Sequence, residues 1–247
     1  MCDHPNIIDD PWLTAILRKD AYKLVIDASL LRDEEGCRRL SELQRRSVFM
    51  YAKVPVDDLV AVRFAQRAGF HLVDTNVVFE RKQPAADAPV AARCEVRWAV
   101  AEDGPQAVEL SGRSFRCSRF HLDPEIPRDL ADRIKAEWAR SFFAGKRGQR
   151  MAVARIGGSL VGFLLLLEAP DGTLTIDLIA TDADHRRTGV AQSLIAFVQS
   201  PSDRPRRLRV GTQLANIPSV RLYEKMGYQI AEAMYVFHYH NGQAAER

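Results

Sequence analysis

Residues 174–199 read LTIDLIATDADHRRTGVAQSLIAFVQ, in which an apolar run is followed by a basic turn and then by a second apolar run. The first run predicts a β-strand, and the second predicts an α-helix that begins after Gly189. The first turn of a helix carries unpaired backbone N–H groups and the positive end of the helix dipole, and both attract a pyrophosphate. Gly189 lets phosphate oxygens approach the backbone, Ala191 keeps the first turn free of bulk, and the arginines add positive charge. The expected anion site therefore consists of Arg186, Arg187, Thr188, Gly189, Val190 and Ala191, with a solvated basic turn as the alternative.

A second motif, NIPSVRLYEKMGY, follows at residues 216–228. Asn216 or Ser219 can cap a helix there, and Gly227 can end it in the left-handed conformation. Tyr223 lies one turn beyond Ser219, where its hydroxyl can face a site. The alternative is a core tyrosine whose oxygen bonds to the backbone.

The segments around these motifs alternate between strand and helix patterns. Residues 151–181 predict three consecutive antiparallel strands, because two-residue turn signals at Gly157-Gly158 and Asp171-Gly172 separate apolar runs. Residues 95–100, 208–214 and 231–240 are strand-like, and residues 131–145 form an amphipathic helical pattern. The order predicts an α+β domain built around a mixed, mainly antiparallel sheet.

The composition excludes several classes of protein. Lys+Arg 35 against Asp+Glu 32 leaves +3, which is too balanced for a protein that coats nucleic acid, and the basic cluster at residues 204–209 is expected to be solvated. No apolar run reaches the roughly 18 residues of a membrane helix. The cysteines, Cys2, Cys37, Cys94 and Cys117, form no CxxC pair, so neither a disulfide framework nor a metal site is indicated. The N-terminus lacks a signal pattern, so we expect a cytoplasmic protein.

A linker and an internal repeat divide the chain. QPAADAPVAA, at residues 83–92, is typical of a linker, so we expect a smaller domain at residues 1–82 and a larger one at 93–247. Before it, residues 48–54 and 72–81 are strand-like, and residues 30–43 and 57–69 are helix-like. An offset of 158 residues lays VAVRFAQRAGFHLVDTNVVF over PSVRLYEKMGYQIAEAMYVF without a gap. A degenerate duplication is one interpretation, and chance similarity of two strand–helix–strand units is the other.

The two copies of this repeat differ where chemistry is expected. Ala65 stands in the first copy where Tyr223 stands in the second, and the first copy has no basic turn. A duplicated first half would therefore have kept the scaffold and lost the chemistry.

Taken together, R-x-x-G-x-A at one helix and N-x-x-S-x-x-x-Y-x-x-x-G-Y at the next resemble the acetyl-CoA signature of the GNAT acetyltransferases, over about residues 93–247. The resemblance implies a GNAT fold whose strands at residues 174–181 and 208–214 diverge at their middle, with the pantetheine of acetyl-CoA in the gap. It implies that residues 186–191 hold the pyrophosphate and that no metal takes part. It also implies that the backbone near Ile179 and Ala180 polarises the thioester carbonyl and that Asn216 and Ser219 contact the cofactor.

The same resemblance implies that Tyr223 protonates the leaving thiolate. Coenzyme A leaves with a thiol pKa of about 8.5, and a phenol with a pKa of about 10 can share a proton with it. Attack by an amine needs that amine neutral, and no motif fixes a base. Asp177, Glu168, His121 and His185 are candidates, each equally explained as an exposed or capping residue, and a water chain can substitute.

Residues 69–81, 115–148 and 208–240 are similar to the dTDP-fucosamine acetyltransferase group, in which a truncated GNAT-like half precedes a catalytic one. This similarity implies acetylation of the 4-amino group of a dTDP-4-amino-4,6-dideoxyhexose. Arg119, Phe120 and His121 are then candidate acceptor residues, because an arginine beside an aromatic ring can hold a diphosphate and stack a base or sugar. A capped loop is the alternative for that segment, and Trp138 is expected in the core.

Other functions stay open at this point. The acceptor can instead be a protein N-terminus, a lysine or a small-molecule amine, and an acyl-CoA-binding sensor without turnover is a further alternative. The expected partner is a small-molecule amine rather than nucleic acid or a membrane. A homodimer is also compatible, with the first half as a contact surface or as a lid over the substrate.

Overall fold

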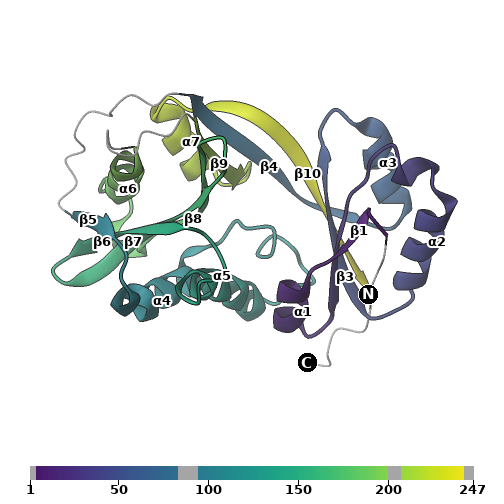
Figure 1. Cartoon of the computed structure of the whole chain (residues 1–247), viewed down its shortest axis with the longest axis horizontal. Helices are drawn as coiled ribbons and strands as arrows, with labels where there is room; N and C mark the ends of the chain where they lie inside the picture. Colours follow the sequence, from purple (N-terminus) through teal and green to yellow (C-terminus); the bar gives the residue numbers. More distant parts are fainter. Residues whose placement is uncertain (1–3, 83–93, 200–206, 242–247) are drawn as a thin grey trace.

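A ten-stranded mixed sheet organises the part of the chain that the computed structural model describes, residues 4–82, 94–199 and 207–241. The strand order is β1-β2-β3-β10-β4-β9-β8-β7-β6-β5. Figure 1 shows two lobes, with the long strands β4 and β10 running from one to the other. The strands are β1 Ile7–Asp9, β2 Asp20–Leu24, β3 Val48–Pro55, β4 His71–Lys82, β5 Glu95–Trp98, β6 Arg150–Ile156, β7 Ser159–Glu168, β8 Thr173–Thr181, β9 Arg207–Gln213 and β10 Gln229–Asn241.

Seven α-helices are described. They are α1 Pro11–Leu17, α2 Glu34–Leu43, α3 Leu59–Arg67, α4 Gly104–Ser114, α5 Arg128–Phe143, α6 Val190–Val198 and α7 Ile217–Lys225. Short 3-10 turns stand at Leu30–Arg32, Ala101–Asp103 and Ala183–His185. None of the described helices is both long enough and apolar enough to cross a lipid bilayer.

Helices α3 and α7 begin and end as the sequence predicts. Asp58 caps α3 by accepting a hydrogen bond from the backbone of Ala61, and Asn216 caps α7 by accepting one from Ser219. The left-handed residues Gly69 and Gly227 follow their C-terminal ends.

The antiparallel strands β6, β7 and β8 confirm the expectation for residues 151–181. Strand β8 then pairs in parallel with β9, but only from Thr173 to Ile176. Beyond Ile176 the two strands diverge, and β8 has no described strand partner on that side. This divergence confirms the splayed sheet implied by the GNAT resemblance.

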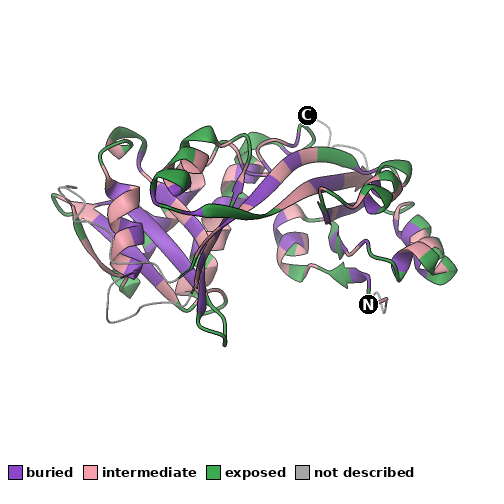
Figure 2. Ribbon diagram, turned by 90° about the horizontal axis from the view of Figure 1, so that it is seen from above, coloured by how far each residue is buried: buried purple, intermediate pink, exposed green. Residues whose placement is uncertain are grey.

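Helices cover both faces of the sheet around this divergence. Side chains of α6 and α7 pack into a core cluster on one face, and those of α4 and α5 pack into another on the opposite face. A Cβ on Gly162 of β7 would lie 2.7 Å from Cγ1 of Val190, so the absence of a side chain lets the start of α6 approach the sheet closely. Buried residues accordingly fill both lobes, as Figure 2 shows.

The internal repeat is present in three dimensions. Adding 158 to the bounds of α3 gives those of α7, and the same offset relates β3 to β9 and β4 to β10 to within one residue at each end. The bulged residues also correspond, since Val73 and Ala231 are each left unpaired between β4 and β10. Met234 pairs with Asn76, its own counterpart, so a pseudo-twofold axis passes through this pair.

The final strand of each repeat pairs with the other repeat. Strand β10 lies between β3 and β4, and β4 lies between β10 and β9. Lys53 pairs with Val236, and Gly211 pairs with Val78. Gly211 is the counterpart of Lys53 in the repeat, and Val236 is the counterpart of Val78. The two halves thus share one sheet through a reciprocal exchange of strands.

A second contact joins the halves at the helices. Trp12 of α1 packs edge-on against Trp138 of α5, with ring centroids 5.7 Å apart, and its indole N–H donates to Oγ of Ser141 at 3.2 Å. Arg133 donates to the backbone oxygen of Ile16 at 2.6 Å. Helix α5 is therefore held by the N-terminal half as well as by α4.

Some elements were not predicted, namely β1, α1, β2 and α4. The proposed linker at residues 83–92 lies outside the described residues, as does the first half of the basic cluster at 204–209, so the division of the chain at the linker remains a prediction. Cys37, Cys94 and Cys117 are free thiols, and Cys2 lies outside the described part.

The exchanged strands predict that the halves fold together. Residues 93–247 produced alone would leave β9 and β10 without β4 between them, so we expect no cooperative unfolding transition in this fragment. Adding the fragment 1–92 should restore the transition, measured by circular dichroism during thermal unfolding. A lone 93–247 fragment that melts at the midpoint of the whole chain would contradict this expectation.

Candidate active site

A cavity opens where β8 and β9 diverge. It has a volume of about 480 Å³ and is bounded by Thr175–Ile179 of β8 and Arg209–Gln213 of β9. Side chains from α5 and α7, from the loops on either side of α5, and from β3, β4 and β10 complete its walls. The cavity therefore reaches both faces of the sheet through the gap between these strands.

Six of the predicted cofactor and acceptor residues line this cavity. They are Ile179 on β8, Asn216, Ser219 and Tyr223 on α7, and Arg119 and Phe120 in the loop before α5. Ala180 packs instead among the side chains of α4 and α5. His121 also lies outside the lining, with its ring bonded to Ser118 at 2.6 Å and to Asp132 at 3.0 Å.

Tyr223 belongs both to the core and to the cavity wall. It is 2% exposed and packs against the rings of Phe79 and Tyr228, with centroids 5.6 and 5.7 Å away. Burial raises the pKa of its phenol above the ordinary value of 10.0. Tyr223 is therefore protonated at neutral pH, the form required of a proton donor.

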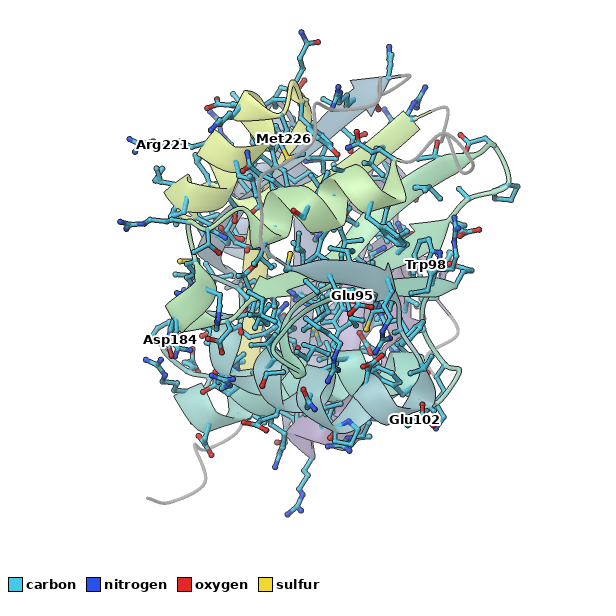
Figure 3. All side chains as sticks on the ribbon, turned by 90° about the vertical axis from the view of Figure 1, so that its left-hand side faces the viewer. Glu95, Trp98, Glu102, Asp184, Arg221 and Met226 are labelled. Carbon is cyan, nitrogen blue, oxygen red and sulfur yellow. The ribbon has the colours of Figure 1, made fainter. Side chains whose placement is uncertain are left out.

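The basic turn before α6 lies apart from the cavity wall, since none of its residues is among the lining residues. Arg187 and Gly189 both have left-handed backbone angles, with φ of 64° and 90°. No side chain in the described part of the protein caps α6, so the first-turn N–H groups are open to a ligand. Figure 3 shows that this turn, marked by Asp184, and α7, marked by Arg221, lie on the same side of the molecule.

Asp177 is the one member of the four proposed bases that lines the cavity. It sits at a bulge in β8 and accepts two hydrogen bonds from Arg147, at 2.6 and 2.8 Å, and one from Trp138 at 2.7 Å. Glu168 instead bonds to Arg150, and His185 lies 3.4 Å from Asp182. Trp138, expected in the core, thus also contributes to the cavity.

A buried hydrogen-bond network holds Arg119 in the wall. Asp123 accepts from Nδ1 of His238 at 2.5 Å and from Nε2 of His240 at 2.7 Å. Nε2 of His238 accepts from the guanidinium of Arg119 at 3.0 Å, so the proton of this imidazole must be on Nδ1. The guanidinium also stacks on the rings of Tyr51 and Phe120, 4.0 and 4.2 Å from their centroids.

This network has strongly perturbed acidities. Burial lowers the pKa of His238 to about 4, and the charge of Arg119 acts in the same direction. Burial acts to raise the pKa of Asp123, but the hydrogen bonds from the two histidines hold it well below its usual value. His238 is therefore neutral and Asp123 ionised at neutral pH.

The ligand atoms of Asp123, His238 and His240 lie within 4.8 Å of one another, a spacing that metal ligands also show. However, a metal on Nδ1 of His238 would require the remaining proton on Nε2, the atom that accepts from Arg119. The arrangement therefore fits a network that positions Arg119 better than it fits a metal centre.

Sequence reasoning missed three cationic residues of the cavity, Lys53, Lys135 and Arg147. Lys135 is 8% exposed on α5, between the core residues Ala131 and Ala139 of the same helical face. A charged residue in that apolar stripe was a signal that could have been read. Lys53 of β3 also lines the cavity, and only its pairing with β10 explains why it lies there.

The chain matches one family model over residues 95–228, described as the "Acetyltransferase (GNAT) family". It is 28% identical to the spore coat polysaccharide biosynthesis protein SpsD of Bacillus subtilis (strain 168), over 96% of this chain and 84% of that protein.

Solved structures share the fold at low sequence identity. A functionally unknown conserved protein from Staphylococcus epidermidis ATCC 12228 aligns with a TM-score of 0.65 and 14% identity, covering 91% of this chain and 85% of that one. A tandem GNAT protein from the clavulanic acid biosynthesis pathway aligns with a TM-score of 0.61 and 13% identity, covering 90% and 76%. The tandem arrangement is thus found in a solved structure of the same fold.

The neutral, buried His238 predicts a pH dependence of stability. In the unfolded chain its pKa returns to about 6.5, so the unfolded state binds a proton more strongly than the folded state between pH 6.5 and pH 4. We expect this residue to lower the free energy of unfolding by up to about 3 kcal/mol across that window and to have no effect above it.

The measurement is denaturant unfolding at a series of pH values, in the wild type and in His238→Gln. A glutamine can still donate and accept, so the variant should lose this pH dependence, whereas His71→Gln, at an exposed position, should retain it. Parallel profiles in wild type and His238→Gln would show that another group carries the dependence.

Proposed function

Because the chain belongs to the GNAT acetyltransferase family and is an acyltransferase, we propose that it transfers an acetyl group from acetyl-CoA to the amine of a nucleotide-linked amino sugar. The observation that carries this proposal is the cavity at the divergence of β8 and β9, which Tyr223 lines from α7. A thioester carbonyl in this gap would lie beside strand backbone that has no strand partner.

The proposed cofactor site combines the turn before α6 with the divergent strands. The pyrophosphate of acetyl-CoA would bind the open N–H groups at Gly189, Val190 and Ala191, with Arg186, Arg187 and Thr188 around it. The pantetheine arm would lie between β8 and β9, near the backbone of Ile179 and Ala180 and beside Asn216 and Ser219. Coenzyme A is a cosubstrate in this scheme, and the chemistry that it supplies is an activated acetyl thioester.

In the proposed reaction the acceptor nitrogen attacks the thioester carbonyl. The new C–N bond forms, the C–S bond breaks, and the ammonium formed loses a proton to solvent or a base. The departing sulfur takes a proton from the phenol of Tyr223, which solvent later replaces. The raised pKa of Tyr223 keeps the phenol in the protonated form that a proton donor needs.

Two lines of support favour an amino sugar as the acceptor. The relative SpsD is named for polysaccharide biosynthesis, and the sequence is similar to the dTDP-fucosamine acetyltransferase group. Arg119 and Phe120 lie side by side in the cavity wall, where a cation and an aromatic ring can bind a nucleotide sugar. A protein N-terminus, a lysine or a small-molecule amine is the second candidate acceptor.

The function is tested by incubating the protein with acetyl-CoA and a panel of amines, with free thiol release and product mass as readouts. The panel contains a nucleoside-diphosphate 4-amino sugar, the free amino sugar, a lysine peptide and a peptide with a free N-terminus. The proposal expects the nucleotide sugar to have the highest kcat/KM, and a preference for either peptide would overturn it.

We expect Tyr223→Phe to lower kcat by about 10²- to 10⁴-fold, because the thiolate would then leave without a positioned acid. The affinity for acetyl-CoA should change little, since the ring is retained. Tyr228→Phe is the matched control, because Tyr228 is also buried but does not line the cavity. Turnover and acetyl-CoA binding are measured by thiol release and calorimetry, and an unchanged kcat in Tyr223→Phe would remove this residue from the mechanism.

We expect Gly189→Ala to weaken acetyl-CoA binding by at least tenfold, because a side chain at φ 90° forces the turn to change shape. Gly145→Ala is the matched control, because Gly145 also has a positive φ of 67° but lies at the end of α5 with open space around it. Calorimetric titration with acetyl-CoA compares the two, and equal losses of affinity would show that strain alone is responsible.

A further inference from the structure

We propose that the cavity binds an anionic group of the acceptor, a phosphate or a carboxylate, between Lys53, Arg119 and Lys135. The inference rests on the proposed function, since it specifies the chemical class of that acceptor. The three residues come from β3, from the loop between α4 and α5, and from α5. Figure 1 shows this loop lying between the two lobes.

The charge balance of the cavity supports an anionic ligand. Its described lining contains five cationic side chains and two carboxylates. Both carboxylates are already paired, Asp177 with Arg147 and Glu232 with Arg209. The described wall therefore offers no carboxylate to Lys53, Arg119 or Lys135. Because like charges close together in a protein repel strongly, an anion bound between these three side chains would be stabilised.

Lys135 is the clearest sign of a missing partner. Its side chain is 8% exposed and lines the cavity, and among the described residues its ammonium contacts the faces of Phe115 and Trp138, 4.8 and 4.3 Å from their centroids. Burial, the largest cause, and the positive charges of Arg119, Arg147 and Lys53 together lower its pKa to about 7. The negative charge of Asp177 acts in the opposite direction. A buried cation with three donors and no acceptor is stabilised when an anion enters.

Arg119 is fixed in place before any ligand arrives. It is stacked on two rings and tied to His238, so its guanidinium loses little freedom on binding. Burial lowers its pKa to about 10, which still leaves it charged at neutral pH. A rigid guanidinium can donate two parallel hydrogen bonds to a phosphate or carboxylate.

Three carboxylates outside the cavity wall interact with these cations: Asp10 and Asp123 with Arg119, and Asp74 with Lys53 and Arg119. Asp74 of β4 is close enough to Lys53 and Arg119 to interact with them electrostatically, but it does not line the cavity and forms no ion pair with either. Burial raises its pKa to about 6, and its Oδ2 has no hydrogen-bond partner. None of the three lines the cavity or forms a described ion pair with these cations, so the wall itself keeps an excess of positive charge.

This anion site is separate from the one proposed for the cofactor. The turn at residues 186–191 is not part of the cavity lining, so phosphates bound there would not neutralise Lys53 or Lys135. The N-terminal half, through Lys53, would therefore take part directly in acceptor binding.

The test uses protein saturated with coenzyme A, so that the turn before α6 is already filled. Thymidine diphosphate, pyrophosphate and glucuronate are titrated into it by calorimetry. We expect at least one of them to bind, with affinity about 10- to 100-fold lower in Lys53→Met and in Lys135→Met. Binding of the phosphates alone or of glucuronate alone identifies the anionic group.

Lys23→Met is the matched control. Lys23 is an exposed residue of β2 close enough to influence the charge of Lys53, but it does not line the cavity, so its removal changes net charge equally. Its affinity for the probe should remain that of the wild type. Lys53 itself is accessible to solvent, so Lys53→Met is expected to fold and keeps the test decisive if Lys135→Met is unstable.

A second readout measures the uptake of protons when the probe binds. When an anion neutralises the surroundings of Lys135, its pKa rises, so binding near pH 7.5 should take up a proton that Lys135→Met does not take up. Titrations in buffers of different ionisation enthalpy measure this uptake.

The proposal is overturned if no probe binds the coenzyme A-saturated protein, or if binding is equal in wild type, Lys53→Met and Lys135→Met. The binding assay involves no acetyl transfer, so it tests the anion site separately from the proposed acceptor. If the enzyme acetylated only peptides, the nucleotide-sugar acceptor would be refuted, and the binding of the probes would still decide whether the anion site exists.

Discussion

Strands β8 and β9 share hydrogen bonds from Thr173 to Ile176 and then separate, and the candidate active site depends on that separation. Paired strands satisfy their own backbone groups, whereas separated strands leave N–H and C=O groups that a ligand can bind. The helices on the two faces keep the strands apart, since α7 brings Tyr223 from one side and α5 brings Lys135 and Trp138 from the other. The cavity thus exists because the hydrogen-bonded pairing of β8 and β9 ends at Ile176.

The sequence predicted the elements that have strong local signals. The glycine turns between β6, β7 and β8 and the caps of α3 and α7 could be read because each depends on neighbouring residues only. Helix α1 and strands β1 and β2 are short and were missed. The offset of 158 residues was also visible, but the exchange of β4 and β10 was not, because strand pairing between distant segments leaves no local trace.

The site was predictable to a similar degree. Tyr223 and Asn216 were found because their spacing on one helix is a recognisable pattern, and Arg119 because an aromatic residue follows it. Lys53 was not found, since the alternation within β3 only indicates a residue facing away from the local core. Its place in the cavity depends on β10, since its pairing partner Val236 comes 183 positions later in the chain.

The exchange of strands also determines which edges the sheet exposes. Its longest strands, β4 with 12 residues and β10 with 13, are paired on both sides. The two edges are β1, with three residues, and β5, with four. Unpaired edges are where sheets of different molecules join during aggregation, and short edges offer few hydrogen bonds for such joining. The intertwined halves therefore protect the protein against edge-to-edge association.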